Sequence, residues 1–247
     1  MPVGDYGHFR KLKAGIPDGI IKLLCLRRGI AGIDGNGQSE LVYALTGLMK
    51  AESGKVFLGD KEITHMSVRE RNLAGISHIP EDRHKHGLVL DYSLENNLVL
   101  KRYFDKQFSE KGFLKFSEIR QYAEGLIEKF DVRSGQGPVT TARSMSGGNQ
   151  QKAIIAREID LGNDLLIAVQ PTRGLDVGAI EYIRKELLRQ RDSGKAVLLV
   201  SLELDEVLEV PDRILVMYEG EIVGELDPRN TTAKELGLYM AGAQRNG

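Results

Sequence analysis

The sequence has a single cysteine, no tryptophan and no long apolar run. Cys25 cannot form a disulfide within the chain and is compatible with a reducing compartment. The longest apolar runs, such as AVLLV from Ala196, are far shorter than the roughly 20 residues that span a bilayer. The first residues contain no apolar stretch followed by a small-residue cleavage site. We therefore expect a cytoplasmic protein without a disulfide framework or a membrane span.

Net charge is also nearly absent. The 34 Lys and Arg residues balance 35 Asp and Glu residues, which leaves a formal charge of -1. No large electrostatic field therefore points to nucleic acid or to an anionic membrane surface, and we expect no nucleic-acid partner. Of the 247 residues, 41% are apolar, which is enough for a sizeable core.

Short apolar runs alternate along the chain with longer amphipathic segments. LLIAV near 167, VLLVSL near 200 and RILVMY near 215 are typical of buried strands. Between two of them, the segment from Ala179 to Gly194 has the periodicity of a helix that covers a sheet. The alternation predicts an α/β fold of the P-loop type, with a mainly parallel sheet, flanking helices and a small antiparallel portion.

Three regions differ from this pattern. Residues 1–28 contain no alternating strand pattern and form an atypical segment before the main domain, 29–247. Ser93 to Val139 is charged, has helical periodicity and shows no convincing strand, so we expect a helical subdomain over about 93–160. Residues 231–247 read as a capped C-terminal helix and a tail.

The stretch GIDGNGQS has the glycine spacing of a loop that wraps a phosphate. Gly32, Gly37 and Ser39 fit the pattern, a strand precedes the loop and a helix follows it, but Gln38 stands where the lysine belongs. A strand-to-helix turn without a ligand is about equally compatible with this motif alone. A dinucleotide fingerprint fails at its third glycine, where Glu40 stands. The candidate nucleotide-binding residues are Gly32, Asp34, Gly35, Asn36, Gly37, Gln38, Ser39 and Glu40.

A second glycine-rich motif, SMSGGNQQK, opens a helix at Ser146. A hydroxyl and free backbone N–H groups at a helix N-terminus attract an anion, although alone an ordinary N-capped helix is the simpler interpretation. The two motifs occur in this order and are followed by LLIAVQPTRGLDVGA. This combination, over about Gly29 to Pro228, resembles the ATP-binding cassettes of ABC transporters.

The stretches GIDGNGQSEL, PEDRHKHGLVLDYSLENNLVL and QPTRGLDVGA narrow the resemblance. They are similar to the C-terminal cassette of double-cassette ATPases that power importers of nucleosides and simple sugars. The resemblance implies ATP as ligand, a second cassette and permease subunits as partners, an indirect link to a solute-binding protein, and a place at the inner face of the membrane. It makes Asp176 the D-loop aspartate. The signature that contacts the other cassette's nucleotide would be Ser146, Gly147, Gly148, Asn149 and Gln150.

Positions that carry chemistry in such cassettes are altered here. Gln38 replaces the phosphate-loop lysine, and Val169 and Gln170 replace the magnesium aspartate and catalytic glutamate. Leu202 stands at the switch histidine and Glu81 at the Q-loop glutamine. Ser39 remains as a weak magnesium ligand. The resemblance therefore implies a chain whose own site is degenerate and whose signature completes a partner's site.

Two alternatives remain open at this point. The chain is an active ATPase whose altered motifs are compensated, or it is a fragment with no independent role. The fragment interpretation gains support from the first 28 residues, because neither Tyr6 nor Phe9 can be assigned to the aromatic residue that stacks on adenine in the family.

Overall fold

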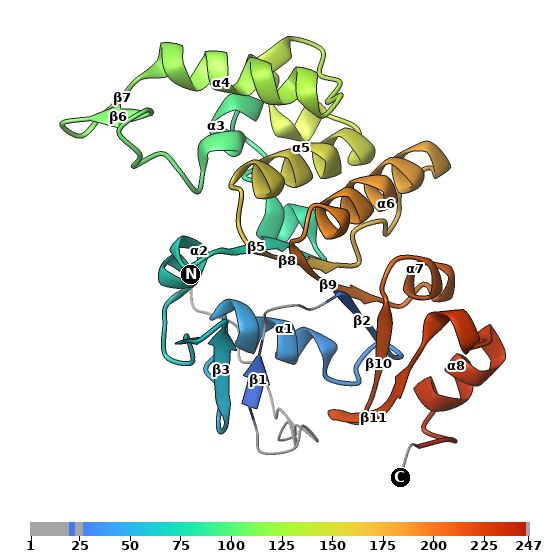
Figure 1. The fold of residues 1–247 in the computed structure, drawn as a ribbon. Coiled ribbons are helices and arrows are strands. Elements are labelled where there is room, and N and C mark those ends of the chain that lie inside the picture. The colour runs from blue at the N-terminus through green and yellow to red at the C-terminus, as the bar shows by residue number, and fades with distance from the viewer. Residues whose placement is uncertain (1–19, 23–26, 246–247) are drawn as a thin grey trace. The chain divides into compact units, whose positions relative to one another are not determined.

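The computed structural model of the chain describes residues 20–22 and 27–245 (Figure 1). Cys25, Tyr6 and Phe9 lie outside the described residues. The chain divides into two compact units. One consists of Met1–Ala74 with Leu198–Gly247, and the other of Gly75–Val197. We call them the loop unit and the signature unit, after the motif that each contains.

The loop unit is built on strands in the order β11-β10-β2-β9. Strand β2 (Arg27–Ala31) pairs in parallel with β10 (Arg213–Tyr218), and β11 (Glu221–Leu226) pairs antiparallel with β10. Strand β9 (Ala196–Ser201) lies next to β2. Helices α7 (Leu204–Glu209) and α8 (Ala233–Met240) contribute apolar side chains to the core at these strands. Thr232 caps α8, as the sequence predicted.

A small second sheet completes the loop unit. It contains β1 (Ile20–Lys22), β3 (Lys55–Leu58) and β4 (Lys61–Glu62), with β1 parallel and β4 antiparallel to β3. Residues 1–28 show no alternating strand pattern in the sequence and yet contain β1, because a three-residue strand is too short to show alternation. The predicted small antiparallel portion is present at β3–β4 and at β10–β11.

Helix α1 (Gln38–Thr46) follows the glycine loop, and its C-terminus is held by a buried arginine of α2 (Val68–Leu73). The Arg71 guanidinium donates to the carbonyl oxygens of Ala44 and Leu45 at 2.5 and 2.8 Å and to that of Thr64 at 2.7 Å. These bonds satisfy carbonyls that the end of a helix leaves without partners. They fix the helix that begins at the loop.

The signature unit pairs β5 (Ile76–Ile79) in parallel with β8 (Leu165–Val169), whose residues are all buried. Two long helices follow the predicted positions, α5 (Gly147–Asp160) and α6 (Val177–Asp192). Helix α6 begins two residues before the predicted start because the Asp176 side chain caps it. Helices α3 (Leu94–Val99) and α4 (Phe116–Lys129) pack with α5 around Leu98 and Leu126.

A β-hairpin in this unit differs from the sequence prediction. Strands β6 (Ser109–Glu110) and β7 (Phe113–Leu114) pair antiparallel within the stretch that was expected to hold no strand. Lys111 and Gly112 form the turn with φ of 49° and 85°, as in the turns that suit tight hairpins. Two-residue strands carry no periodic signal, which is why the sequence does not reveal them.

The fold prediction is confirmed in its main features. The runs near 167, 200 and 215 are strands β8, β9 and β10, and the strand expected before the glycine loop is β2. Parallel pairing of β2 with β10 and of β5 with β8 makes the architecture α/β with mainly parallel strands. Among the described residues, no helix combines the length and apolar character that a membrane crossing requires.

Candidate nucleotide loop and signature helix

The glycine-rich loop joins β2 to α1 in the loop unit, as the phosphate-loop pattern requires. Gly35 and Gly37 have φ of 85° and 103°, in the left-handed region that favours glycine. The Asn36 side chain accepts from the Glu219 N–H at 3.0 Å, and its carbonyl accepts from the Gly220 N–H at 2.9 Å. The turn between β10 and β11 therefore holds the loop, while Asp34 and Gly35 are exposed.

The Gln38 side chain folds back over its own loop. It is 6% exposed, and its Nε2 donates to the Ile33 carbonyl at 3.2 Å. A Cβ placed on Gly32 would lie 2.0 Å from that nitrogen, so the amide rests directly against the start of the loop. A phosphate entering the loop has to displace an uncharged amide that already satisfies a backbone carbonyl. The lysine of the standard pattern would instead bring a positive charge to the phosphate.

The other predicted site residues of this unit are the polar Ser39 and Glu40 in α1 and the apolar Leu202 after β9. Ser39 and Glu40 lie in the first turn of α1 and are half-buried. Ser201 ends β9, is 0% exposed, and accepts from the Glu203 N–H at 3.1 Å. Leu202 follows it with a half-buried side chain that can neither donate nor accept a hydrogen bond.

In the signature unit, the positions expected to hold an aspartate and a glutamate provide no carboxylate. Val169 ends β8 and is 5% exposed. Gln170 is 7% exposed and has φ of 48°, a left-handed conformation that costs a residue with a side chain about 1 kcal/mol or more. The Gln170 carbonyl accepts from the Arg173 N–H at 3.1 Å and closes the turn.

Magnesium does not fit this set of donors. The ion takes carboxylate and hydroxyl oxygens, and of the two predicted ligand side chains only that of Ser39 supplies an oxygen, since that of Val169 is a hydrocarbon. Within residues 20–22 and 27–245, no cluster of three or more His, Cys, Asp and Glu residues is arranged to hold a metal.

The signature residues form the ordered N-terminus of α5. Ser146 is exposed and caps the helix, its Oγ accepting from the Asn149 N–H at 3.4 Å and from Asn149 Nδ2 at 2.9 Å. Asn149 Oδ1 in turn accepts from the Arg133 N–H at 2.8 Å. A 14-residue helix therefore presents a hydroxyl and the positive end of its dipole to solvent.

The two signature glycines allow close packing. A Cβ on Gly147 would lie 3.0 Å from Arg83 Nη2, and one on Gly148 would lie 3.3 Å from the Ala179 side chain. Asp176 caps α6 by accepting from the Ala179 N–H at 2.9 Å. The signature and the predicted D-loop aspartate, 28 residues apart in the sequence, thus lie side by side.

The segment around Glu81 also contacts the signature helix, and the contacts bring in Arg83, His84 and Arg173 beside the predicted residues. Glu81 Oε1 pairs with Arg173 Nη1 at 2.5 Å, and Arg83 Nη1 donates to the Arg173 carbonyl at 3.2 Å. His84 Nε2 lies 2.9 Å from Gln150 Oε1. These partners are 66 to 92 residues apart, so no local sequence pattern could predict the contacts.

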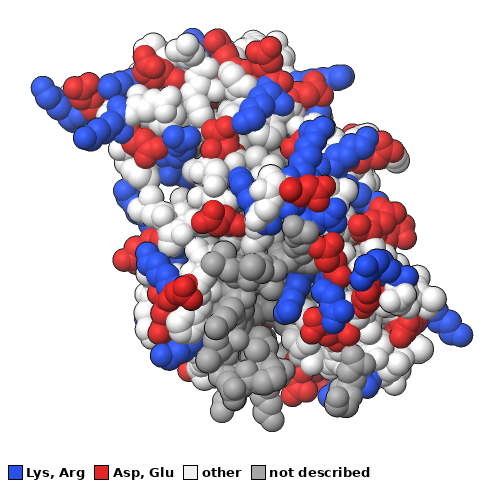
Figure 2. Space-filling model, viewed as in Figure 1, with Lys and Arg blue, Asp and Glu red and all other residues white. Residues whose placement is uncertain are grey.

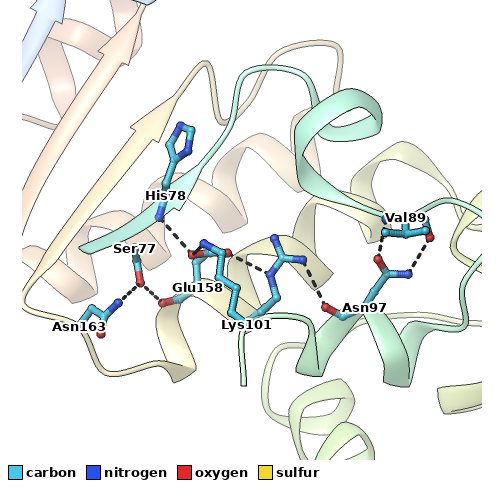
Figure 3. A network of polar contacts seen from close by, with 8 residues as sticks. Ser77, His78, Val89, Asn97, Lys101, Glu158 and Asn163 are labelled. Atoms are coloured by element: carbon cyan, nitrogen blue, oxygen red, sulfur yellow. Dashed lines mark hydrogen bonds and ion pairs between the residues drawn. The ribbon is translucent and has the colours of Figure 1, made fainter. Parts of the chain in front are cut away.

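A buried polar network ties the other end of α5 to β5 (Figure 3). Glu158 is 1% exposed, and its carboxylate accepts from Lys101 Nζ at 2.6 Å, from Arg157 Nε at 3.0 Å and from the His78 N–H at 3.1 Å. Its carbonyl accepts from Ser77 Oγ at 2.7 Å. Burial disfavours the charged form of Glu158, but Lys101 and Arg157 outweigh it and hold the pKa of Glu158 below its usual value.

The imidazole of His78 points away from this carboxylate, and its Nε2 is buried without a hydrogen-bond partner among the described residues (Figure 3). Burial, followed by the charge of Lys101, lowers the pKa of His78 to about 4. The unfolded chain binds this proton near pH 6.5, whereas the folded chain does not, so stability present above pH 6.5 is lost as the pH falls towards 4.

We expect the pH change from 7 to 4 to reduce the free energy of unfolding of the parent by about 2 kcal/mol more than that of His78→Gln. The full shift corresponds to about 3 kcal/mol, which we reduce because the side chain is half-buried. Urea unfolding of both proteins across this pH range measures the difference. Parallel pH profiles for parent and variant would contradict the assignment.

One unit contains a strand, a glycine loop and a helix, and the other contains a helix that begins with glycines. These features define a P-loop type of nucleotide-binding domain. The family model described as ABC transporter matches residues 26–173. The chain belongs to this family, whose members bind ATP, normally with Mg²⁺.

Two curated relatives are import ATP-binding proteins. The guanosine import ATP-binding protein NupO of Bacillus subtilis is 55% identical over 87% of this chain and 42% of its own length. The nucleoside import ATP-binding protein NupA of Lactococcus lactis is 54% identical over 88% of this chain and 43% of its own length. The chain therefore spans about two-fifths of the curated relatives that it matches.

Solved structures agree on the fold. The ATP-binding cassette MJ1267 in its ADP conformation matches 87% of this chain and 83% of its own, with a TM-score of 0.65 and 21% identity. A dimeric ATP-binding cassette, MJ0796, matches with a TM-score of 0.68 and 22% identity over 83% of this chain and 86% of its own. At this identity the likeness concerns the fold alone.

Proposed function

We propose that the chain is the degenerate cassette of an ABC importer, in which its signature helix completes the ATP site of a partner cassette. The observation that carries the proposal is a contrast between two sets of residues. The signature set is ordered and exposed at Ser146, whereas the chain's own set has Gln38 folded over the loop and Val169 and Gln170 without a carboxylate.

The chain's own glycine loop can bind a nucleotide but is not expected to hydrolyse it. Its backbone keeps the left-handed glycines of a phosphate loop, but Gln38 replaces a charged donor. Hydrogen bonds to charged groups contribute about 1.5–3 kcal/mol, against about 0.5–1.5 kcal/mol for neutral ones. A missing general base at Gln170 costs roughly 10²–10⁴ in rate. Hydrolysis at this loop is therefore not expected.

The partners follow from the same proposal. A second cassette places its nucleotide against Ser146, and permease subunits hold the pair at the inner face of the membrane, with a solute-binding protein acting on the permease. The segment around Glu81 faces the permease, and its contacts with Gln150 and Arg173 place it next to the signature helix. The guanosine and nucleoside import relatives are 55% and 54% identical to this chain, whereas a glucose import ATP-binding protein of Haloferax volcanii is 45% identical. The higher identity favours nucleosides over simple sugars as the transported solute.

We expect the purified chain to bind a fluorescent ATP analogue weakly and to release no phosphate in the same tubes. Gln38→Lys should tighten binding roughly fivefold or more, because it introduces a charge-assisted bond, and should still give no turnover, because Val169 and Gln170 are unchanged. Gln121→Lys, which adds the same charge on the exposed face of α4, is the control and should bind like the parent.

Two results would count against the proposal. Steady phosphate release that follows the protein through purification would favour the alternative of an active ATPase with compensated motifs. A chain that binds no nucleotide and has no effect on a partner cassette's ATPase would favour the alternative of a fragment without an independent role.

A further inference from the structure

The β6–β7 hairpin lies at one end of the signature unit (Figure 1), and large apolar side chains in and next to it are exposed. We call residues 106–116 the hairpin tip. Within it, Phe113 is 79% exposed, Phe116 is 64% exposed and Leu114 is 41% exposed. Contiguous exposed apolar groups of this size mark interaction sites more often than isolated ones do.

The base of the hairpin tip is firmly packed, so the exposure does not come from a loose segment. Phe108 is 0% exposed, and its ring lies 4.9 Å from that of Tyr122. The Arg102 guanidinium lies 5.4 Å from the Phe108 ring centre. The Lys115 N–H donates to the Phe108 carbonyl at 2.8 Å and closes the hairpin. Phe108 is therefore part of the core, whereas Phe113, Leu114 and Phe116 contribute little to it.

Basic side chains surround these apolar groups. The hairpin tip contains three lysines, Lys106, Lys111 and Lys115, against one glutamate, Glu110, which gives a local charge of +2. Glu110 pairs with Lys115 at 3.1 Å, while Lys106 and Lys111 are exposed. In the region of the hairpin, Figure 2 shows blue side chains with red ones among them. The nearly neutral total charge hides this local cluster.

We propose that the hairpin tip docks on an anionic bilayer surface, with its apolar side chains at the headgroup boundary and its lysines at the lipid phosphates. Phe113 and Leu114 are adjacent in β7, so they point to opposite faces of the hairpin, and both are exposed. A fluid lipid boundary can cover both faces of such a finger at once. The pairing of exposed Phe and Leu with lysine is the composition of interfacial membrane anchors.

This surface lies outside the residues assigned to nucleotide and signature, so the proposal does not depend on the proposed function. Each lysine near an anionic surface contributes about a fivefold increase in binding, and each buried aromatic side chain roughly tenfold. The chain as a whole carries a charge of -1, so attraction to anionic lipid has to arise locally.

The test is cosedimentation of the full chain with vesicles of phosphatidylcholine alone or mixed in equal parts with phosphatidylglycerol. We expect binding to the mixed vesicles that weakens as salt is added. The double variant Phe113→Ser with Phe116→Ser should bind at least about tenfold more weakly. Lys111→Glu, which reverses one charge, should weaken binding by at least about fivefold.

Leu73→Ser and Lys185→Glu are the matched controls, since these side chains are 63% and 68% exposed and lie far outside the hairpin tip in the sequence. Both should bind as the parent does, and circular dichroism checks that every variant is folded. Three results would overturn the proposal, namely no binding to mixed vesicles, equal binding to neutral and mixed vesicles, or equal losses in the controls and the tip variants.

Discussion

In a reconstituted importer, Ser146→Arg is expected to abolish ATP hydrolysis, with a loss of roughly 10²-fold or more. The substitution removes the exposed hydroxyl at the N-terminus of α5 and fills the space in front of it with a long side chain. Removing one donor that stabilises a developing charge typically costs 10²–10³ in rate, and the bulk of arginine also hinders a partner's phosphates. Nucleotide binding at the chain's own loop, measured with the fluorescent analogue, should not change.

The control for this experiment has to separate the signature from the loss of a helix cap. Ser146 caps α5, and replacing a capping serine costs about 1 kcal/mol of stability. Ser67 caps α2 in the loop unit and is also exposed, so Ser67→Arg removes a cap and adds a charge outside the signature. Full ATPase activity in Ser67→Arg beside none in Ser146→Arg supports the proposal. Unaltered activity in Ser146→Arg would remove the basis of the trans role.

Glu158→Leu is expected to lower the free energy of unfolding by about 3–5 kcal/mol. Breaking a buried ion pair on one side leaves the other charge without compensation, and here both Lys101 and Arg157 lose their carboxylate. The His78 N–H also loses its acceptor. Chemical denaturation of parent and variant measures the difference.

An exposed ion pair provides the contrast. Asp91 pairs with Arg143 at 2.8 Å, and their side chains are 77% and 60% exposed. Asp91→Ala should change stability by less than about 1 kcal/mol, because exposed pairs are screened by solvent. Equal losses in the two variants would mean that the Glu158 network is not buried in solution. That network holds the C-terminal end of α5 to β5. The Glu158→Leu variant is therefore also expected to hold the signature residues, at the other end of α5, less firmly in place.

The sequence predicted the elements that carry strong local signals. Buried apolar runs identified β8, β9 and β10, helical periodicity from Ala179 identified α6, and the capped C-terminal segment identified α8. It also placed the signature at the start of α5, because serine and glycine open helices by a local mechanism. The hairpin at β6–β7 and the strand β1 were missed because strands of two or three residues have no measurable period.

The contacts that define the site were beyond the reach of local patterns. Gln38 was identified as a substitution, but only the structure shows its amide bonded to the Ile33 carbonyl. The links from Arg83 and His84 to Arg173 and Gln150 join residues that are 90 and 66 positions apart. Such pairings depend on tertiary packing, which a single sequence does not encode in any readable repeat.

The division of the chain has a consequence for how such a protein can change. The residues proposed to serve a partner cassette, from Ser146 to Asp176, all lie in one uninterrupted stretch, Gly75–Val197. The altered positions of the chain's own site are instead scattered over both units, with Gln38 and Leu202 in one and Val169 and Gln170 in the other. A single recombination event that moved Gly75–Val197 into another cassette would therefore transfer the donated residues together with two of the altered positions, Val169 and Gln170. Recovery of the chain's own catalysis would require separate mutations at distant points of the gene.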